Sequence, residues 1–456
     1  MSDLYQNLVS LLGAGKVSSS AEDITTYSID RWNASAPPEV VVFAESTADV
    51  SATLKYAHEH DIPVYGRSGG SGYTGGCVPV NGGIALALER MDKILEINPR
   101  DGIARAQPGV ITKTLADTVR EHGWYYPPDP ASLKECGIGG NVATNAGGPR
   151  CLKYGVTRSY ILGLEVVLAD GSIMHTGGRC HKNKTGFDLV GLFCGSEGML
   201  GIITEVTVRI IPHPQTRAML GVAFADFTAA AAAVNAILDS GVLPSALEIT
   251  DAFTLEAARD YLGEDKLPPG DAYLIVEIDG QLDTVASEIQ SLKSFIEGLG
   301  ALRIDLAPDE DACEEIWQLR RDFSYGLRNT GMTKLNEDIV VPRSKLVQLV
   351  EYCQQIEADT GIPVACFGHA GDGNIHTNLM VGDYDDPKTK QSADKAVDQL
   401  FQWVLANDGA ITGEHGIGLA KKKWAQQALG ETSYLLHQRI KNELDPKGIL
   451  NPGKFL

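Results

Sequence analysis

The chain has 456 residues, 43% of them hydrophobic and 21% charged, which is an ordinary balance for a globular protein with two or three domains. Its formal net charge of −20 argues against nucleic acid or an anionic membrane as a partner. No apolar run reaches the roughly 18 residues of a membrane-spanning helix, and no secretory signal is recognisable at the N-terminus. The eight cysteines are scattered without a Cys-x-x-Cys pair, so we expect reduced thiols in a cytoplasmic protein.

Strands, short helices and long Gly-rich loops are predicted to alternate from about residue 40 to residue 212. Ser46 or Thr47 is expected to cap a helix that runs through His60, and a strand over Ile62–Tyr65 follows it. A further strand is expected over Ile84–Leu88. Three Gly-rich loops lie in this region, at Gly66–Gly76, Pro127–Gly148 and Gly195–Gly201, and the last leads into a strand over Ile202–Ile211.

Pro212 and Pro214 mark a domain boundary, after which regular strand–helix units follow. The predicted elements are strands over Met219–Phe224, Tyr273–Ile278 and Glu337–Val341, and helices over Thr228–Leu238, Thr284–Leu299 and Asp309–Asn329. We therefore expect a first domain over residues 1–215 and an α+β domain over residues 216–405. The segment 406–456 follows as a third part, with a basic helix from Leu419.

The first Gly-rich loop contains a G-x-G-x-x-G sequence, Gly70–Gly75, that is typical of Rossmann dinucleotide sites. In such sites a helix opens at the end of the motif and faces the pyrophosphate. Here Pro79 and Asn81–Gly83 prevent that helix, so we reject the Rossmann interpretation. Consecutive glycines can still direct backbone N–H groups at an anion, and Arg67 adds charge. One such loop alone would be a run of tight turns, but three in one domain favour a large phosphate-bearing cofactor.

Two segments near the C-terminus combine histidines with a carboxylate. The first, Gly-His-Ala-Gly-Asp-Gly-Asn-Ile-His-Thr-Asn, carries His369, His376 and Asn378, and the second, Thr-Gly-Glu-His-Gly-Ile-Gly, carries Glu414 and His415. A hairpin through the Gly-Asp-Gly-Asn turn would put His369 opposite His376, with Asn378 on the same face. Two imidazoles and a carboxylate form a metal site with open coordination positions, beside which His415 remains as a base. The alternative is a pair of polar loops whose histidines only satisfy turn hydrogen bonds.

The Gly-rich loops resemble those of the vanillyl-alcohol-oxidase superfamily, and the C-terminal segments resemble its metal-dependent D-2-hydroxy-acid dehydrogenase branch. That branch covers D-2-hydroxyglutarate dehydrogenase, D-lactate dehydrogenase and the flavin subunit of glycolate oxidase. The motifs that carry the resemblance are Gly-Gly-Asn-Val-Ala-Thr-Asn-Ala-Gly-Gly, Gly-Ser-Glu-Gly-Met-Leu-Gly-Ile-Ile-Thr, Gly-Asp-Gly-Asn-Ile-His and Glu-His-Gly-Ile-Gly, and the similarity runs from about Tyr27 to Leu456. It implies an α+β fold with a two-part FAD-binding domain and a ferredoxin-like substrate domain that carries the histidine hairpin. A C-terminal segment would return to the flavin and close the active site.

The resemblance implies that FAD binds to the three Gly-rich loops, with residues 67–72 at the pyrophosphate. The cofactor-binding residues that it implies are Arg67, Ser68, Gly69, Gly70, Ser71, Gly72, Ser132, Gly139, Gly140, Asn141, Thr144, Glu197, Gly198, Gly201 and Ile203. In members whose flavin is linked to a histidine, that histidine follows the Arg-Ser-Gly-Gly run, where this chain has Ser71. We therefore expect FAD that is bound without a covalent link.

The resemblance also implies a divalent metal ion on His369, His376 and Glu414, with zinc favoured and manganese or iron as alternatives. Asn378 and His415 are expected to contact the substrate, and His415 is also the expected catalytic base.

The branch uses an Arg, a hydroxyl residue four positions later and a Lys further on to hold the substrate, and Arg320, Ser324 and Lys334 fit this pattern. The hydroxyl residue is Ser where relatives carry Thr, Lys334 lies one residue nearer, and the neighbouring Arg321 permits a shift of one position. Alternatively, these residues are solvated charges on a helix face.

Taken together, the resemblance implies an FAD- and metal-dependent dehydrogenase that oxidises a D-2-hydroxy acid such as D-lactate, glycolate or D-2-hydroxyglutarate. Hydride would pass to flavin N5 while His415 takes the hydroxyl proton. The implied electron acceptor is a quinone, an electron-transferring flavoprotein, a cytochrome or a partner subunit, through which the chain could lie at a membrane surface, and a homodimer is a further option. The alternatives are the flavin subunit of a multi-subunit glycolate oxidase, a non-haem iron oxygenase that uses the same two-His, one-carboxylate set, and a non-catalytic FAD-binding subunit.

Overall fold

The computed structural model describes residues 3–32 and 34–456, and the chain divides into two compact units. Unit 1 consists of Met1–Gly148, Gly155–His213 and Glu414–Leu456, and unit 2 of Pro149–Tyr154 and Pro214–Gly413. The last crossing between the units therefore falls between Gly413 and Glu414, inside the second C-terminal motif. Among the described residues, no helix is both long enough and apolar enough to cross a membrane.

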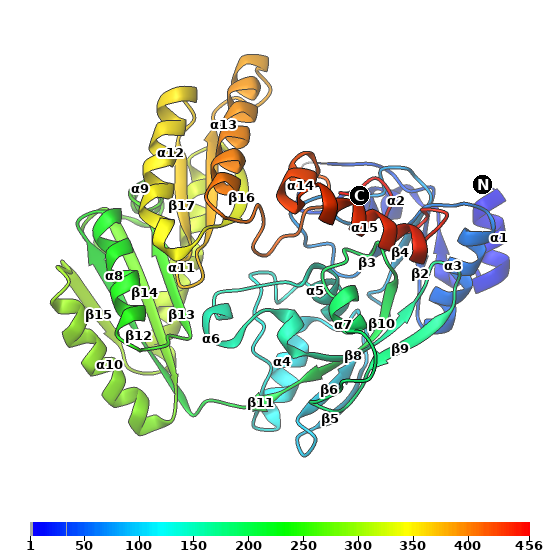
Figure 1. Ribbon diagram of the computed structural model, residues 1–456, viewed down its shortest axis with the longest axis horizontal. Helices are drawn as coiled ribbons and strands as arrows, with labels where there is room; N and C mark the ends of the chain where they lie inside the picture. The colour runs from blue at the N-terminus through cyan, green and yellow to red at the C-terminus, as the bar shows by residue number, and fades with distance from the viewer. Residues whose placement is uncertain (1–2, 33) are drawn as a thin grey trace. The chain divides into compact units, whose positions relative to one another are not determined.

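Unit 1 begins with a four-stranded sheet in the order β1-β2-β4-β3 (Figure 1). Strands β2 and β3 run parallel to β4, and β1 is antiparallel to β2. The strands are β1 (Val17–Ser18), β2 (Val40–Phe43), β3 (Val64–Arg67) and β4 (Ile84–Ala87), and the helices beside them are α1 (Asp3–Leu12), α2 (Ala21–Tyr27) and α3 (Thr47–Glu59). Ile449 and Leu450 of the C-terminal segment lie in the same apolar core. The end of the chain is thus part of the first domain's interior.

A second, antiparallel sheet of unit 1 has the order β5-β6-β10-β8-β9, and β7 pairs with β11 in a short ribbon. The strands of this sheet are β5 (Ile94–Asn98), β6 (Ile103–Ala106), β8 (Ile161–Val167), β9 (Ile173–Gly177) and β10 (Ile202–Arg209), and those of the ribbon are β7 (Trp124–Tyr125) and β11 (Ile211–Pro212). The helices of this part and of the C-terminal segment are α4 (Thr112–Glu121), α5 (Ile138–Thr144), α7 (Leu189–Phe193), α14 (Lys422–Leu429) and α15 (Glu431–Leu444), with 3-10 turns at Ala14–Lys16 and Thr157–Tyr160. Helix α5 packs against β10, so two of the three Gly-rich segments meet there.

Unit 2 is built on one antiparallel sheet of seven strands, in the order β15-β12-β14-β13-β17-β18-β16 (Figure 1). The strands are β12 (Thr216–Phe224), β13 (Ala246–Thr250), β14 (Ala272–Gly280), β15 (Arg303–Ala307), β16 (Thr333–Val340), β17 (Val364–His369) and β18 (Asn374–Val381). The helices are α6 (Cys151–Tyr154), α8 (Phe227–Asp239), α9 (Ala252–Leu262), α10 (Leu282–Glu297), α11 (Glu310–Asn329), α12 (Leu346–Thr360) and α13 (Pro387–Ala406), with 3-10 turns at Glu264–Lys266 and Arg343–Lys345.

Two layers of helices cover the sheet of unit 2. Helices α8, α10, α12 and α13 pack in one layer, whereas α9 and α11 pack together in the other. Met219, Tyr273 and Ile275 of the sheet form a core with Trp317 and Phe323 of α11. The face under α9 and α11 also carries the polar side chains of the candidate site, because residues opposite each other in neighbouring strands share a face.

The expected α+β class is confirmed, and most elements lie within a few residues of their predicted ranges. The Ser46 side chain caps α3, as the sequence predicts, and Asp309, predicted as the first residue of its helix, caps α11. Strand β3 begins at Val64 and not at Ile62, because Pro63 has no N–H to give to a strand ladder. Helix α14 begins three residues after the predicted Leu419.

One prediction about the Gly-rich loops was wrong. The segment Pro127–Gly148 is not a continuous loop, because it contains helix α5 over Ile138–Thr144. The buried side chains of Ile138 and Val142 hold this helix, and Gly139 lets it approach closely, since a Cβ there would lie 2.4 Å from the Cβ of Pro108. Packing against a neighbouring loop therefore overrides the low helix propensity of its two glycines.

Candidate functional site

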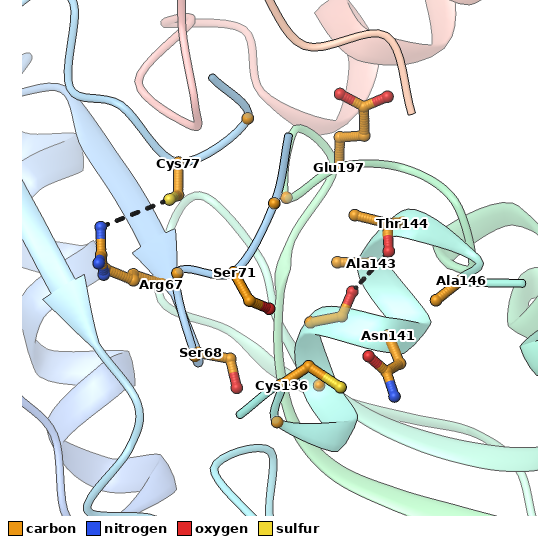
Figure 2. Close-up of a pocket in the computed structure, with 18 of the residues that line it drawn as sticks. Arg67, Ser68, Ser71, Cys77, Cys136, Asn141, Ala143, Thr144, Ala146 and Glu197 are labelled. Atoms are coloured by element: carbon orange, nitrogen blue, oxygen red, sulfur yellow. Dashed lines mark hydrogen bonds between the residues drawn. The ribbon is translucent and has the colours of Figure 1, made fainter. Parts of the chain in front are cut away.

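A deep cleft of unit 1, with about 1270 Å³ of space including its open mouth, lies between the three Gly-rich segments. All of the residues expected to bind a cofactor line it: Arg67, Ser68, Gly69, Gly70, Ser71, Gly72, Ser132, Gly139, Gly140, Asn141, Thr144, Glu197, Gly198, Gly201 and Ile203. Figure 2 shows Ser68, Ser71, Asn141 and Thr144 around this space.

The glycines of the cleft have two different roles. A Cβ on Gly69 would lie 2.3 Å from the carbonyl oxygen of Glu135, and one on Gly137 would lie 2.0 Å from Oγ of Ser68, so these glycines let the loops approach one another. A Cβ on Gly140 or Gly198 would meet no protein atom closer than 3.4 Å. Side chains at these two positions would occupy the cleft itself, which fits a surface shaped for an extended cofactor.

Arg67 does not direct its charge into the cleft in the way that its sequence position suggests. Its guanidinium donates a hydrogen bond to the sulfur of Cys77 (Figure 2). It also donates one to the carbonyl oxygen of Ile29 and lies 5.1 Å from the centre of the Tyr27 ring. The consecutive glycines that follow can still direct backbone N–H groups at an anion.

Ser71 occupies the position at which a histidyl-linked flavin would require histidine. Its hydroxyl oxygen lies 3.4 Å from that of Ser132, on the second Gly-rich segment. A hydroxyl group at this place offers a hydrogen bond but no imidazole for a flavin linkage.

We therefore predict that acid precipitation of the purified protein will release its yellow chromophore into the supernatant. The measurement is flavin absorbance in the supernatant together with flavin fluorescence of the denatured polypeptide on a gel. Fluorescence that stays with the polypeptide would contradict non-covalent binding.

Glu197 lines the cleft, but its carboxylate is engaged by the C-terminal segment. Oε1 accepts a hydrogen bond from the N–H of Ile417 at 2.7 Å, and Oε2 accepts one from Gly418 at 2.9 Å. The residue has a positive φ of 51°, and burial raises the pKa of its carboxyl group. Glu197 therefore both lines the cleft and holds the backbone of the C-terminal segment.

Glu414 and His415 also line this cleft, so unit 1 brings them to the Gly-rich loops. The ring of Tyr73 stacks on His415, with centroids 5.3 Å apart and planes 27° apart. Gly147 leaves room for Glu414, since a Cβ there would lie 3.0 Å from its Cγ. The C-terminal motif is thus held against the first and second Gly-rich segments.

His369 and His376 lie in unit 2 on the neighbouring strands β17 and β18. The expected hairpin is present, but its register differs from the prediction: His369 pairs with Asn374, and His376 pairs with Phe367. The turn is tighter than expected because the ladder closes at Asn374. The two histidines are diagonal neighbours on one face, and their ring centroids are 5.4 Å apart.

Glu248 of β13 is a functional candidate that the sequence analysis missed. Its Oε1 lies 2.5 Å from Nδ1 of His369, and its Oε2 accepts a hydrogen bond of 2.8 Å from Nε of Arg320. Burial opposes ionisation, but the charges of His369 and Arg320 outweigh it and lower the pKa of Glu248 to about 2. An ionised carboxylate only accepts, so Nδ1 of His369 carries the proton and Nε2 is the nitrogen that can bind a metal ion.

The remaining expected substrate residues gather on the same face of unit 2. Nζ of Lys334 lies 3.1 Å from the hydroxyl oxygen of Ser324, and Arg320 lies 4.6 Å from the ring centre of Phe367. Burial, and then the charges of Arg328 and Arg320, lower the pKa of Lys334 to about 8, so the amine remains charged at neutral pH. In the part of the chain that the structure describes, no carboxylate lies within ion-pair distance of Lys334, which makes it suited to bind an anionic ligand.

Asn378 of β18 is fully buried on this face. Its amide NH₂ donates to the carbonyl oxygens of Ala365 and His376, at 3.2 and 3.0 Å, which fixes the orientation of the amide. The Oδ1 atom has no hydrogen-bond partner among the described residues. A buried acceptor without a donor is costly, and a hydroxyl group of a ligand would satisfy it.

Comparison with known proteins places this architecture in one family. Residues 213–455 match the family of FAD-linked oxidases, C-terminal domain, and residues 38–177 match the FAD-binding domain family. The chain is 35% identical over 454 residues to the glycolate oxidase subunit GlcD of Bacillus subtilis, covering 99% of this chain and 96% of that protein. It is also 35% identical to a D-lactate dehydrogenase of Archaeoglobus fulgidus, covering 91% of each.

The fold also resembles that of p-cresol methylhydroxylase solved with substrate bound, with a TM-score of 0.82 and 20% identity over 99% of this chain and 96% of that one. The vanillyl-alcohol-oxidase type of fold is thereby confirmed. The cleft and the two domain matches define an FAD-dependent oxidoreductase. The chain belongs to the FAD-linked oxidase family and is of the glycolate oxidase and D-lactate dehydrogenase type.

Proposed function

We propose that this protein oxidises a D-2-hydroxy acid to the corresponding 2-oxo acid and requires both FAD and a divalent metal ion. The observation that carries this proposal is the group on one face of unit 2: a histidine oriented by Glu248, a second histidine, and Lys334 without an acidic partner. On such a face, metal ligands lie next to a positive charge that can bind the carboxylate of a substrate. The relatives named as a glycolate oxidase subunit and a D-lactate dehydrogenase support the same substrate class.

The residues of the cleft fit FAD, since its lining comes from three Gly-rich segments and includes glycines that open onto free space. When bound, FAD supplies the acceptor for the hydride that leaves C2 of the substrate. Because a non-haem iron oxygenase would not need this domain, the FAD-binding domain match argues against that alternative.

His369, His376 and Glu414 are the proposed metal ligands, and two nitrogen donors with one oxygen donor favour zinc over the alternatives manganese and iron. The position of Gly413, the residue directly before Glu414, supports Glu414 as a metal ligand. Asp338 lies opposite His376 in the sheet, and it accepts a hydrogen bond of 2.9 Å from the N–H of Gly413. Glu414 follows Gly413 directly, so the chain enters unit 1 from a point held beside His376.

Arg320 and Lys334 are proposed to bind the substrate carboxylate, with Ser324 orienting the lysine. A guanidinium can hold a carboxylate through two parallel hydrogen bonds, and the charged amine adds a second contact. Asn378 is proposed to accept a hydrogen bond from the substrate hydroxyl group through its unpartnered Oδ1. These contacts would fix the C2 hydrogen in one direction and so select one enantiomer.

His415 is proposed to accept the hydroxyl proton of the substrate. Oxidation of a 2-hydroxy acid removes one proton and one hydride, and an imidazole with a pKa near ~6.5 can take the proton only if the hydroxyl group is acidified. A divalent ion supplies that acidification when it is bound. The stacked ring of Tyr73 keeps the imidazole at the cleft.

Electrons would leave the protein to an acceptor such as a quinone, an electron-transferring flavoprotein, a cytochrome or a partner subunit. The relative named as a glycolate oxidase subunit favours a second version of the proposal, in which this chain is the flavin subunit of a larger enzyme.

A panel of D- and L-2-hydroxy acids with an artificial dye acceptor tests the proposed function. We expect dye reduction with at least one D-2-hydroxy acid or with glycolate. For a chiral substrate, kcat/KM should be at least about 100-fold lower for the L enantiomer than for the D enantiomer, which corresponds to a difference of roughly 2.7 kcal/mol in activation free energy. Bleaching of the flavin by the same acid without dye checks that the electrons pass through FAD. A protein that reduces dye with L acids only, or with no 2-hydroxy acid while holding FAD and metal, would contradict the proposal.

A further inference from the structure

The segment Thr412–Gly418, which carries Glu414 and His415, donates hydrogen bonds to a carboxylate at each end: Asp338 binds Thr412 and Gly413, and Glu197 binds Ile417 and Gly418. We propose that Asp338 and Glu197 are positioning residues for Glu414 and His415, respectively, and act through the backbone on either side of them. This inference rests on the proposed function, because it assigns a purpose to the position of these two side chains.

The first end of the segment is fixed within unit 2. Oδ2 of Asp338 accepts hydrogen bonds of 2.9 Å from the hydroxyl group of Thr412 and of 2.9 Å from the N–H of Gly413. Its Oδ1 accepts a third, of 2.7 Å, from the amide of Asn374, and the side chain has no exposed surface. Three donors around one buried carboxylate leave the residue before Glu414 little freedom.

The second end of the segment is fixed within unit 1. Both oxygens of Glu197 accept backbone N–H groups, one from Ile417 and one from Gly418. Glu197 itself is held in place, because its carbonyl oxygen accepts a hydrogen bond of 2.6 Å from the side chain of Asn451. Its positive φ of 51° is unusual for a residue other than glycine. Such a backbone conformation persists where surrounding contacts impose it, and it is common at functional sites.

The glycines of the segment mark the places where these contacts require close approach. A Cβ on Gly413 would lie 2.4 Å from Nδ2 of Asn374, and one on Gly416 would lie 2.8 Å from Oε1 of Glu197. Gly418 has a positive φ of 49°, and a Cβ there would lie 2.4 Å from the carbonyl oxygen of Thr74. The glycines in Gly-Glu-His-Gly-Ile-Gly thus stand where the backbone comes close to other residues on both sides of Glu414 and His415. On each side, a carboxylate accepts hydrogen bonds from this backbone.

Only Glu414, His415 and Gly416 lie between the two sets of hydrogen bonds. Asp338 holds the residue directly before Glu414, so its loss should act mainly on the proposed metal ligand. Glu197 holds the residues that follow Gly416, so its loss should act mainly on the orientation of His415. Outer hydrogen bonds to metal ligands are typically worth 10–100-fold in metal affinity or activity, and a small misplacement of a catalytic group can cost about 100-fold in rate.

The test compares Asp338→Asn and Glu197→Gln with the wild-type holoenzyme. An amide has one acceptor oxygen and one NH₂ group that only donates. Glu197→Gln therefore presents its NH₂ group to one of the two backbone N–H groups, and Asp338→Asn presents its NH₂ group either to Thr412 and Gly413 or to the side-chain amide of Asn374. Each variant leaves at least one donor without an acceptor and keeps the size of the side chain. We expect Asp338→Asn to lower bound metal and kcat by about 10- to 100-fold. Glu197→Gln should keep metal and FAD, lower kcat by about 10- to 100-fold, and change KM by less than about threefold.

Asp445→Asn is the matched control, because Asp445 is also buried and accepts the N–H groups of Ile449 and Leu450, at 3.0 and 2.7 Å. This turn carries no residue of the proposed site, so Asp445→Asn should keep kcat and KM within about twofold while losing comparable thermal stability. If Asp338→Asn does not accumulate as folded protein, Thr412→Val removes one of its donors and takes its place. The proposal is overturned if both site variants turn over like the control.

Hydrogen exchange of the backbone separates failure of this proposal from failure of the proposed function. Exchange at Gly413 should become faster in Asp338→Asn, and exchange at Ile417 and Gly418 should become faster in Glu197→Gln, whichever substrate the enzyme uses. Unchanged exchange at these amides would overturn the positioning roles even in a fully active dehydrogenase. A wild-type protein without metal or 2-hydroxy-acid turnover would instead refute the proposed function and, with it, the catalytic purpose assigned to the two carboxylates.

Discussion

Replacing His376 with alanine should lower kcat by roughly 10²- to 10⁴-fold while FAD remains bound. The change removes one of the three proposed metal ligands, and a metal ion that assists such chemistry contributes several kcal/mol, at about 1.4 kcal/mol per factor of ten. FAD should remain, because its cleft lies wholly in unit 1 whereas His376 lies on β18 of unit 2. Metal content by elemental analysis, flavin absorbance and turnover are measured on the same sample.

Thr377→Ala provides the control for His376→Ala. Thr377 is the next residue on the same strand and is also buried, but its side chain points to the opposite face of the sheet. This variant should lose stability yet keep metal and kcat. Full activity of a metal-free wild-type sample, or of His376→Ala without metal, would show that the histidine cluster has no part in catalysis.

The sequence predicts those features of this protein that depend on a few consecutive residues, such as Gly-rich loops and tight turns. Gly-rich runs show where a backbone must come close to a ligand or to another loop, and the three runs all line the cleft. The hairpin between β17 and β18 follows from its turn residues, although its register does not, because ladder pairing at Asn374 depends on the neighbouring strands. A shift in the pairing changes which side chains are opposite each other while leaving the strand itself unchanged.

The residues that sequence analysis missed are carboxylates on strands or loops with no motif of their own. Glu248 lies in a strand that reads as an ordinary buried segment, and its role appears only when β13 pairs with β17 and brings it opposite His369. Asp338 gains its role in the same way, through pairing of β16 with β18. A buried acidic residue in an apolar strand was the available signal, since such residues are rarely buried without a partner.

For Arg67, the structure shows partners that the sequence does not predict. Its position beside consecutive glycines predicts a charge directed at an anion, but the structure places its guanidinium against Ile29, Cys77 and Tyr27. Tyr27 and Ile29 belong to a segment about forty residues earlier in the chain, whereas Cys77 lies ten residues later. Sequence spacing alone cannot reveal which of several partners a long side chain will choose.

Replacing His415 with alanine should lower kcat by about 10²- to 10⁴-fold, the usual contribution of a positioned base. His415 lies at the cleft beside Tyr73, and it adjoins the proposed ligand Glu414 without being a ligand itself. His415→Ala should therefore keep both metal and FAD, which distinguishes it from His376→Ala. Metal analysis must accompany the kinetics, because loss of metal would mimic loss of a base.

Added imidazole gives a sharper test of His415→Ala. The truncation leaves space next to Tyr73, and a free imidazole in that space can take the substrate proton, so turnover should rise with imidazole concentration. His175→Ala is the control, since His175 is a largely exposed residue of β9 whose ring has 73% of its surface accessible, and imidazole should leave its rate unchanged. If His415→Ala turns over near the wild-type rate with its metal in place, another group removes the hydroxyl proton. A slow variant that keeps its metal and responds to imidazole identifies proton transfer as the step that His415 performs.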